Sequence, residues 1–207
     1  MTLALWISLL GASIVISFTP GAGAINTMTN AMRLGFRSSI WGILGQQIAL
    51  LMHVIIVAAG VGLLVAGSPA IFAAVRYAGA AYLVYLGIRM ILSKPDVASD
   101  GTTQGGAVGR WAMVRRGILV NLLNPKAIVF FLAFTPQFIR PDQPLIVQYA
   151  IYIGTIICVD ILVMWFFFAA TARTFQRFTA TTRGAKILNL VFGTLFIFVA
   201  ALLLFLH

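Results

Sequence analysis

The chain has 207 residues, of which 61% are hydrophobic and only 9% are charged, against about 25% charged residues in a typical soluble domain. A soluble domain of this length could not cover so much apolar surface, so the composition predicts an integral membrane protein in contact with a lipid bilayer. The formal net charge is +10, but the basic residues are spread through short segments between apolar stretches. That distribution is typical of encoded membrane topology and disfavours nucleic acid as a partner.

Six apolar stretches are long enough to cross a bilayer, for which about 20 residues suffice. In chain order we expect spans at residues 3–19 with a continuation to 32, 40–66, 70–92, 117–139, 145–171 and 187–206. Turns rich in Pro, Gly and Asp separate spans at 67–69 and 140–144. The sequence therefore predicts an all-α integral membrane protein with six transmembrane helices.

Prolines interrupt the first and the fourth span, at Pro20-Gly21 and at Asn124-Pro125. Inside a bilayer, a broken helix is tolerated only where it is buried in protein or lines a cavity. Two breaks at matching positions of two halves indicate a secondary transporter built from inverted repeats, with its substrate near the membrane midplane. We therefore expect a substrate site between the two breaks.

A polar, glycine-rich linker at 93–110 divides the single membrane domain, residues 1–207, into two three-helix repeats, 1–92 and 111–207. An odd number of spans in each half gives the halves opposite orientations. Loops on one side of the membrane then hold 11 basic residues, and loops on the other side hold Arg140 alone. By the positive-inside rule, we expect the linker to be cytoplasmic and both termini to be extracytoplasmic. A cleavable signal peptide is disfavoured because residues 1–24 lack a basic n-region.

Asp160 lies in the middle of the fifth span, where a charged group costs roughly 2.5 to 3.5 kcal/mol and usually marks an ion, proton or substrate path. We interpret it as the proton-coupling group of an exporter. A structural ion pair with Lys126, the residue after the second break, is the alternative. Lys126 is itself a candidate for a substrate carboxylate, together with Asn121 and Asn124 of the same break, or it snorkels to the membrane surface.

The helix after the first break carries polar and small residues at intervals of three and four, so they share one face: Thr19, Gly23, Asn26 and Asn30. We expect this face to line a cavity, although close helix packing is an equal alternative. Gly21 and Gly23 let the backbone approach a ligand. The free N–H groups at the start of the restarted helix suit an anionic substrate group.

Gln46 and His53 lie seven residues apart on the second span and share one of its faces. We include Gln46 among the substrate-binding candidates. When the first half is shifted onto the second by the spacing of the two breaks, His53 falls close to the position of Asp160. His53 is therefore a second proton-coupling candidate, although a hydrogen-bonded packing residue is the commoner role of a lone membrane histidine.

The inventory of reactive residues disfavours an enzyme. Only one acidic residue lies within a span, so no aspartyl dyad can form, and no nucleophile elbow or phosphate-binding loop occurs. The single cysteine, Cys158, permits neither an internal disulfide nor a redox pair. We expect no cofactor and no metal site.

Four segments together resemble the lysine-exporter family of amino-acid efflux proteins, over almost the whole chain. They are FTPGAGAINTMT at 18–29, AGAAYLVYLG at 78–87, NLLNPKAIVFF at 121–131 and PQF at 136–138. The likeness is greatest to the branch that exports homoserine, homoserine lactone and threonine. It implies a small inner-membrane carrier driven by the proton gradient. The family usually has Pro-Gly-Pro after the first span, whereas Ala22 takes the place of the second proline here.

These observations predict an inner-membrane secondary transporter that exports small neutral amino acids or their derivatives by proton antiport. A channel for small solutes is an alternative, because the same breaks could form a selectivity filter. An exporter of cations is a further alternative, disfavoured because one acidic residue supplies few oxygen ligands. The sequence leaves open the amino acid transported, the proton stoichiometry, the effect of Ala22, and whether the chain forms a homo-oligomer.

Overall fold

A computed structural model describes residues 1–67, 69–93, 108–140 and 142–205, and these ranges contain helices and no strand. The elements are α1 (Leu3–Phe18), α2 (Ala22–Leu34), α3 (Ile40–Gly67), α4 (Pro69–Leu92), α5 (Arg110–Leu122), α6 (Pro125–Phe138), α7 (Leu145–Leu162), the π-helix η1 (Val163–Ala169), α8 (Ala170–Thr179) and α9 (Thr182–Phe205). The prediction of an all-α protein is confirmed.

Both expected helix breaks are present in the structure. Four described helical stretches are long and apolar enough to cross a bilayer singly. The pairs α1–α2 and α5–α6 meet that criterion only when each pair is taken together, and they bend by 58° and 62° respectively. Counting each bent pair as one span gives the six spans that the sequence predicts. The inverted relation between the two halves stays a prediction.

Some expected boundaries were wrong. The fourth span begins at Arg110 rather than at residue 117, and the sixth begins at Thr182 rather than at 187. A search for apolar stretches did not predict the first two turns of α5, because they carry three arginines. Arg110, Arg115 and Arg116 are exposed at one end of the bundle. The fifth span runs on through η1 and α8 to Thr179. Residues 94–107, most of the predicted linker, lie outside the described ranges.

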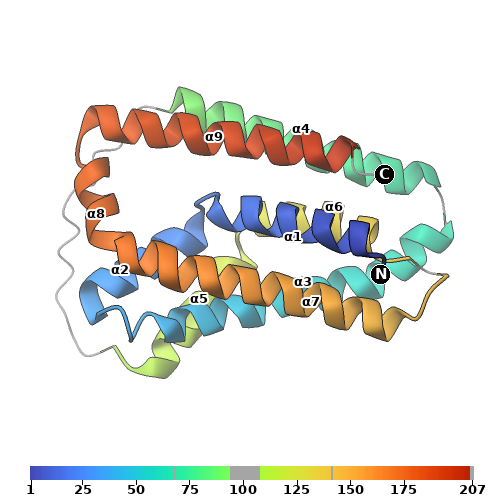
Figure 1. Ribbon diagram of the computed structural model, residues 1–207, viewed down its shortest axis with the longest axis horizontal. Coiled ribbons are helices and arrows are strands. Elements are labelled where there is room, and N and C mark those ends of the chain that lie inside the picture. Colours follow the sequence, from blue (N-terminus) through green and yellow to red (C-terminus); the bar gives the residue numbers. More distant parts are fainter. Residues whose placement is uncertain (68, 94–107, 141, 206–207) are drawn as a thin grey trace.

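The two termini lie at the same end of the bundle (Figure 1). The C-terminal ends of α2 and α4, the N-terminal ends of α3, α5 and α9, and all of α8 lie at the opposite end. Within the described ranges, that opposite end carries most of the basic residues: Arg33, Arg37, Arg89, Arg110, Arg115, Arg116, Arg173, Arg177, Arg183 and Lys186. The sequence-derived asymmetry of charge is therefore an asymmetry between the two ends of the fold.

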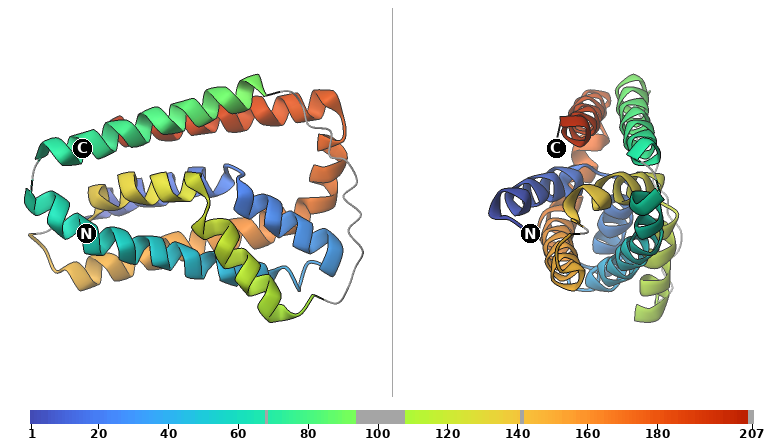
Figure 2. Two further views of the ribbon diagram at one scale, coloured as in Figure 1. Left: turned by 180° about the vertical axis from the view of Figure 1, so that it is seen from behind. Right: turned by 90° about the vertical axis from the view of Figure 1, so that its right-hand side faces the viewer.

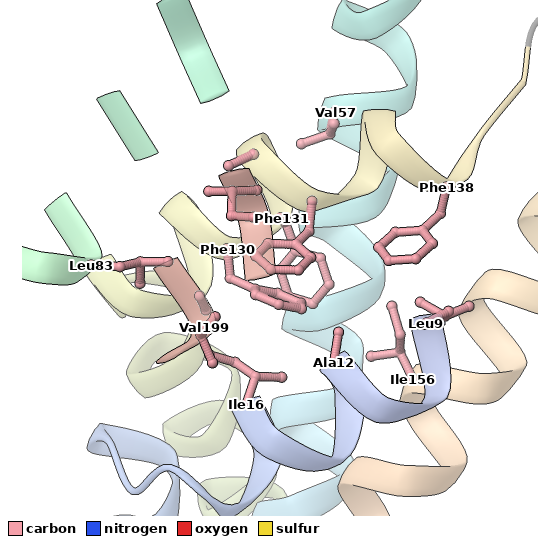
Figure 3. Packing of buried hydrophobic residues seen from close by; sticks show 14 of the residues in the cluster. Leu9, Ala12, Ile16, Val57, Leu83, Phe130, Phe131, Phe138, Ile156 and Val199 are labelled. Atoms are coloured by element: carbon pink, nitrogen blue, oxygen red, sulfur yellow. The ribbon is translucent and has the colours of Figure 1, made fainter. Parts of the chain in front are cut away.

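The apolar core surrounds the two half-helices α1 and α6, which run beside each other through the middle of the bundle (Figure 1). On α6, Phe130, Phe134 and Phe138 follow one another at a spacing of four residues, so they share one face and stack in series. Side chains from α1, α4, α7 and α9 meet this ladder, as Leu9 and Ile156 illustrate (Figure 3). Thr19, Pro20 and Asn124 at the two breaks are buried, whereas Ala22 and Pro125 are exposed.

Glycines allow two close helix contacts. A Cβ at Gly45 of α3 would overlap the backbone carbonyl of Val114 in α5, and one at Gly117 would overlap the carbonyl of Gly42. Small residues of this kind let the backbones of membrane helices approach. The α3–α5 contact fixes the angle at which α5 reaches the second break. A second close pair, α4 with α9, lies along one edge of the bundle (Figure 2).

Candidate functional site

The two helix breaks lie against each other. α1 ends before Pro20, because proline has no N–H to donate to the helix. The side-chain hydroxyl of the buried Thr19 donates a hydrogen bond to Val15 O at 2.8 Å. At the second break, Asn124 caps α6 by accepting from Lys126 N at 3.1 Å. A Cβ at Gly21 would lie 3.4 Å from Lys126 Cδ. The ends of four half-helices therefore converge on one region.

Lys126 joins the second break to the first. Its ammonium donates to Ile16 O at 2.8 Å and also to Thr19 O, both of them carbonyls at the C-terminal end of α1. A helix ends with unpaired carbonyls and a partial negative charge, so an ammonium is stabilised there. The same nitrogen lies 5.7 Å from the centre of the Phe196 ring. Lys126 therefore caps a half-helix of the other half of the chain rather than extending away from it.

Asp160 is held by two donors from different elements. Ser17 Oγ on α1 donates to one carboxylate oxygen at 3.1 Å, and Gln47 Nε2 on α3 donates to the other at 2.7 Å. A hydrogen bond between a neutral donor and a carboxylate is short and strong. Neither charged group takes the other as a hydrogen-bond partner within the described ranges, so the direct ion pair of Asp160 and Lys126, the alternative interpretation from the sequence, does not form in this conformation.

Lys126 and Asp160 both line a small cavity with a volume of about 60 Å³. Its polar walls come from both breaks and from α1, α3, α5 and α7. Its apolar walls come from α1, α2, α3, α6, α7 and η1. The lining residues are Ile16, Ser17, Gly21, Gly23, Ala24, Gln46, Leu50, Asn121, Asn124, Lys126, Ala127, Phe130, Phe131, Ile156, Asp160 and Met164. The space holds water-sized molecules, and an amino acid needs the surrounding helices to separate.

An amide network supports one wall of the cavity. Gln46 Nε2 donates to Gly23 O at 3.2 Å and to Thr27 Oγ1 at 3.0 Å, and Asn121 Nδ2 donates to Gln46 O at 3.0 Å. The network joins α2, α3 and α5, which belong to both halves of the chain. Gln46 is 1% exposed, so the network is fixed by packing as well as by hydrogen bonds.

The structure brings together seven of the predicted site residues as cavity lining: Gly21, Gly23, Gln46, Asn121, Asn124, Lys126 and Asp160. Thr19 lies beside the cavity and contributes its backbone carbonyl to Lys126. Asn26 and Asn30 do not line the cavity, because they turn toward Gly42 of α3. The Asn26 amide and Asn30 Nδ2 are buried without a hydrogen-bond partner in the described part of the chain.

His53 also lies outside the cavity. Its ring stacks on Phe131 with centroids 5.6 Å apart and an interplanar angle of 13°, and Phe131 forms part of the cavity wall. A direct hydrogen bond between His53 and Asp160 is absent from this conformation, since the carboxylate oxygens accept from Ser17 and Gln47. Any part that His53 plays in proton transfer would therefore require a change in packing that moves Phe131 aside.

Sequence reasoning missed Ser17 and Gln47, the two donors to Asp160. Both are polar residues inside predicted spans, which was an available signal, but hydroxyl and amide groups are common in membrane helices as packing contacts. The π-helix η1 was missed too. It begins three residues after Asp160, and wide turns of this kind occur preferentially at functional sites. The aromatic run 165–168 gives no sequence signal for it.

No group of three or more His, Cys, Asp or Glu side chains able to hold a metal ion occurs among the described residues. Asp160 is the one acidic lining residue of the cavity, and its oxygens face a serine and a glutamine. Hard divalent cations take six to eight oxygen ligands, or an octahedral set. The donor set here fits an ammonium or a proton better than a metal ion.

Comparison with known proteins gives consistent results. The model of the LysE type translocator family matches residues 14–206. A homoserine/homoserine lactone efflux protein of Salmonella typhimurium is 41% identical over 98% of this chain and 97% of its own length. An uncharacterised membrane protein of Vibrio cholerae is 35% identical over 95% of this chain and 94% of its own. No solved structure matches. The chain therefore belongs to the LysE type translocator family of membrane proteins.

Proposed function

We propose that the protein is an amino-acid exporter of the inner membrane, acting on small neutral amino acids and derivatives such as homoserine, homoserine lactone and threonine. The observation that carries this proposal is the cavity between the two breaks, which presents one carboxylate and one ammonium among amide and apolar groups. A zwitterionic amino acid carries the same two charges. The relative from Salmonella typhimurium supports the substrate class, since its name states efflux of homoserine and its lactone.

The half-helices supply the polar ends of the proposed site. The first N–H groups of α2 have no side-chain cap, because Gly21 is the capping residue, and they suit a carboxylate or a lactone carbonyl. Asn124 and Lys126 at the start of α6 face the same space. Asp160, which lines the same cavity, would receive the substrate ammonium. Asn26 was a further candidate for the ammonium, but it reaches the substrate only if α2 moves away from Gly42.

Proton antiport would use Asp160. In its ionised form the carboxylate is satisfied by Ser17 and Gln47 and is ready to accept an ammonium. In its protonated form it gains an O–H donor and loses its attraction for the ammonium. Alternation between the two forms would let a proton replace the substrate on the same oxygen atoms. An intramembrane carboxylate with these neighbours is typical of proton-coupled transport.

The charge asymmetry gives the orientation that we propose. The end of the bundle that bears most basic residues would face the cytoplasm, following the positive-inside rule, and the two termini would be extracytoplasmic. Residues of α1, of α6 and of both breaks line the cavity. Substrate would enter from the basic end and leave at the end that holds the termini.

Counterflow in proteoliposomes tests the proposal. Liposomes loaded with unlabelled homoserine should accumulate labelled homoserine above its external concentration, because a carrier exchanges one molecule for another. A pore would only equilibrate the label. Loading with manganese(II) instead of homoserine serves as the control for cation export, and it should not drive uptake of the label. Failure of homoserine, homoserine lactone and threonine alike to support counterflow would contradict the proposed function.

A further inference from the structure

We propose that Lys126 determines the charge selectivity of this transporter. Its ammonium is a fixed positive charge in the cavity wall that balances Asp160, so the site accepts a substrate with one ammonium group and rejects a substrate with a second. The inference rests on the proposed function, because it concerns how the same cavity distinguishes neutral from dibasic amino acids.

The position of the Lys126 ammonium is fixed by contacts on several sides. It donates to the carbonyls of Ile16 and Thr19 at the end of α1 and lies near the face of the Phe196 ring. Its backbone is constrained by Pro125 and by the Asn124 cap at the start of α6. A lysine on a flexible surface could swing away from an incoming cation. This one cannot do so without uncapping α1.

The cavity is otherwise free of formal charge. Lys126 and Asp160 are its two charged lining residues among the described ones, and the remaining polar groups are the hydroxyl of Ser17, backbone groups and the amides of Gln46, Asn121 and Asn124. The nearest titratable ring, that of His53, lies behind Phe131. The two charges of the wall therefore sum to zero, as do the two charges of a neutral amino acid.

A second substrate ammonium has no charged partner in this arrangement. The one carboxylate is shared between Ser17, Gln47 and the substrate α-ammonium, and the carbonyls of Ile16 and Thr19 that would suit another ammonium already accept from Lys126. Like charges a few ångströms apart repel strongly where water is scarce. Lys126 thus both occupies the alternative cation site and repels its competitor.

Homoserine and 2,4-diaminobutyrate form a suitable pair of probes. They share one heavy-atom skeleton and differ in the terminal group, a hydroxyl in one and an ammonium in the other, which stays charged at neutral pH like a lysine side chain. The experiment measures how well each compound, unlabelled, competes with labelled homoserine for exchange in proteoliposomes. With wild-type protein, unlabelled homoserine should compete with the labelled homoserine and diaminobutyrate should not. The N4-acetyl derivative of diaminobutyrate has a neutral terminal group, so its competition tests whether size alone explains the rejection.

Lys126→Gln and Lys126→Met remove the charge, and Met retains the length of the apolar stem beside Phe196. In either variant the preference for homoserine over diaminobutyrate should fall by roughly tenfold or more, the scale expected for one partly screened charge pair. Homoserine itself is expected to bind more weakly, so the ratio is the readout. Lys186→Gln removes the same charge from the exposed start of α9 and should leave the ratio unchanged. Lys126→Arg should retain the wild-type preference.

Three outcomes would overturn the inference. In the first, wild-type protein exchanges diaminobutyrate as well as homoserine, which shows without any variant that the proposed charge selectivity is absent. A folded Lys126 variant with the wild-type ratio shows that the charge is not the cause. A folded variant that binds neither compound, as measured by thermal stabilisation with each, shows that Lys126 only holds the substrate. If wild-type protein exchanges neither homoserine, homoserine lactone nor threonine, the proposed function fails instead.

Discussion

Replacing Gly23 by alanine tests the contact between the restarted helix α2 and the cavity wall. A Cβ at this position would lie 2.8 Å from Gln46 Oε1 and 3.4 Å from Gln46 Cδ, so the amide must retreat by roughly 0.5 Å or more to restore ordinary contact. The three atoms nearest to this Cβ all belong to side chains, which can move, and alanine is favoured over glycine in a helix. We therefore expect the variant to fold.

The retreat of Gln46 separates its amide from Gly23 O and Thr27 Oγ1, the two acceptors that fix it. Two such hydrogen bonds contribute about 1 to 3 kcal/mol together. If that energy holds the wall in its binding geometry, the apparent affinity for homoserine should fall by roughly 5- to 150-fold. The assay is the concentration dependence of homoserine exchange in proteoliposomes, with thermal unfolding in detergent to verify folding.

Two controls make this prediction specific. Gly154→Ala in α7 adds a methyl group with nothing within 4 Å, so its transport and unfolding temperature should match or slightly exceed those of the wild type. Gln46→Ala removes the group that the new methyl displaces, so Gly23→Ala should have little further effect in that background. The reasoning would be refuted if Gly23→Ala lowered homoserine affinity by the same factor with and without Gln46→Ala. Normal affinity in the Gly23→Ala single variant would refute it too.

Three further predictions concern packing, the carboxylate and topology. Gly45→Ala should lower stability by about 1 to 3 kcal/mol, because its methyl group meets the backbone carbonyl of Val114, which cannot rotate away; an unfolding temperature equal to that of the wild type would contradict the α3–α5 contact. Gln47→Leu removes the 2.7 Å donor to Asp160 and should reduce pH-gradient-driven export while the protein still folds, whereas unchanged coupling would show that this donor is dispensable. A reporter active only outside the cytoplasm should function after His207, and its silence beside an active cytoplasmic reporter would reverse the proposed orientation.

The sequence was informative about the fold where the bilayer imposes strict requirements. Unbroken apolar stretches predicted the spans, and Pro20 and Pro125 predicted the two breaks, because neither a polar span nor an unsatisfied backbone is tolerated in lipid. The same argument failed at Arg110, where α5 begins outside the apolar stretch and is stabilised by packing against α3. It also gave no sign of η1, since a π-helix depends on local packing rather than on composition.

The candidate site was predictable in part for a related reason. Charged residues within spans are rare, so Asp160 and Lys126 stood out, and the structure places both on one cavity. Their individual partners could not be inferred. Lys126 donates to carbonyls of α1, and Gln47 rather than Lys126 donates to Asp160. Both contacts depend on how the two halves of the chain pack together. Periodicity placed Asn26 on the same helix face as Gly23, but α2 turns that end of the face toward α3.

The most direct test of the central claim compares Asp160→Asn with wild-type protein in the same proteoliposomes. A neutral amide costs the membrane less than a carboxylate, so the variant should insert and fold. We predict that it loses homoserine transport driven by a pH gradient. Homoserine exchange without a gradient should weaken as well, because the permanently neutral amide mimics the protonated state, which attracts the substrate ammonium less. Transport by Asp160→Asn that still responds to the pH gradient, or recovery of that response when Lys126→Gln is added, would contradict the role of Asp160 as the coupling group.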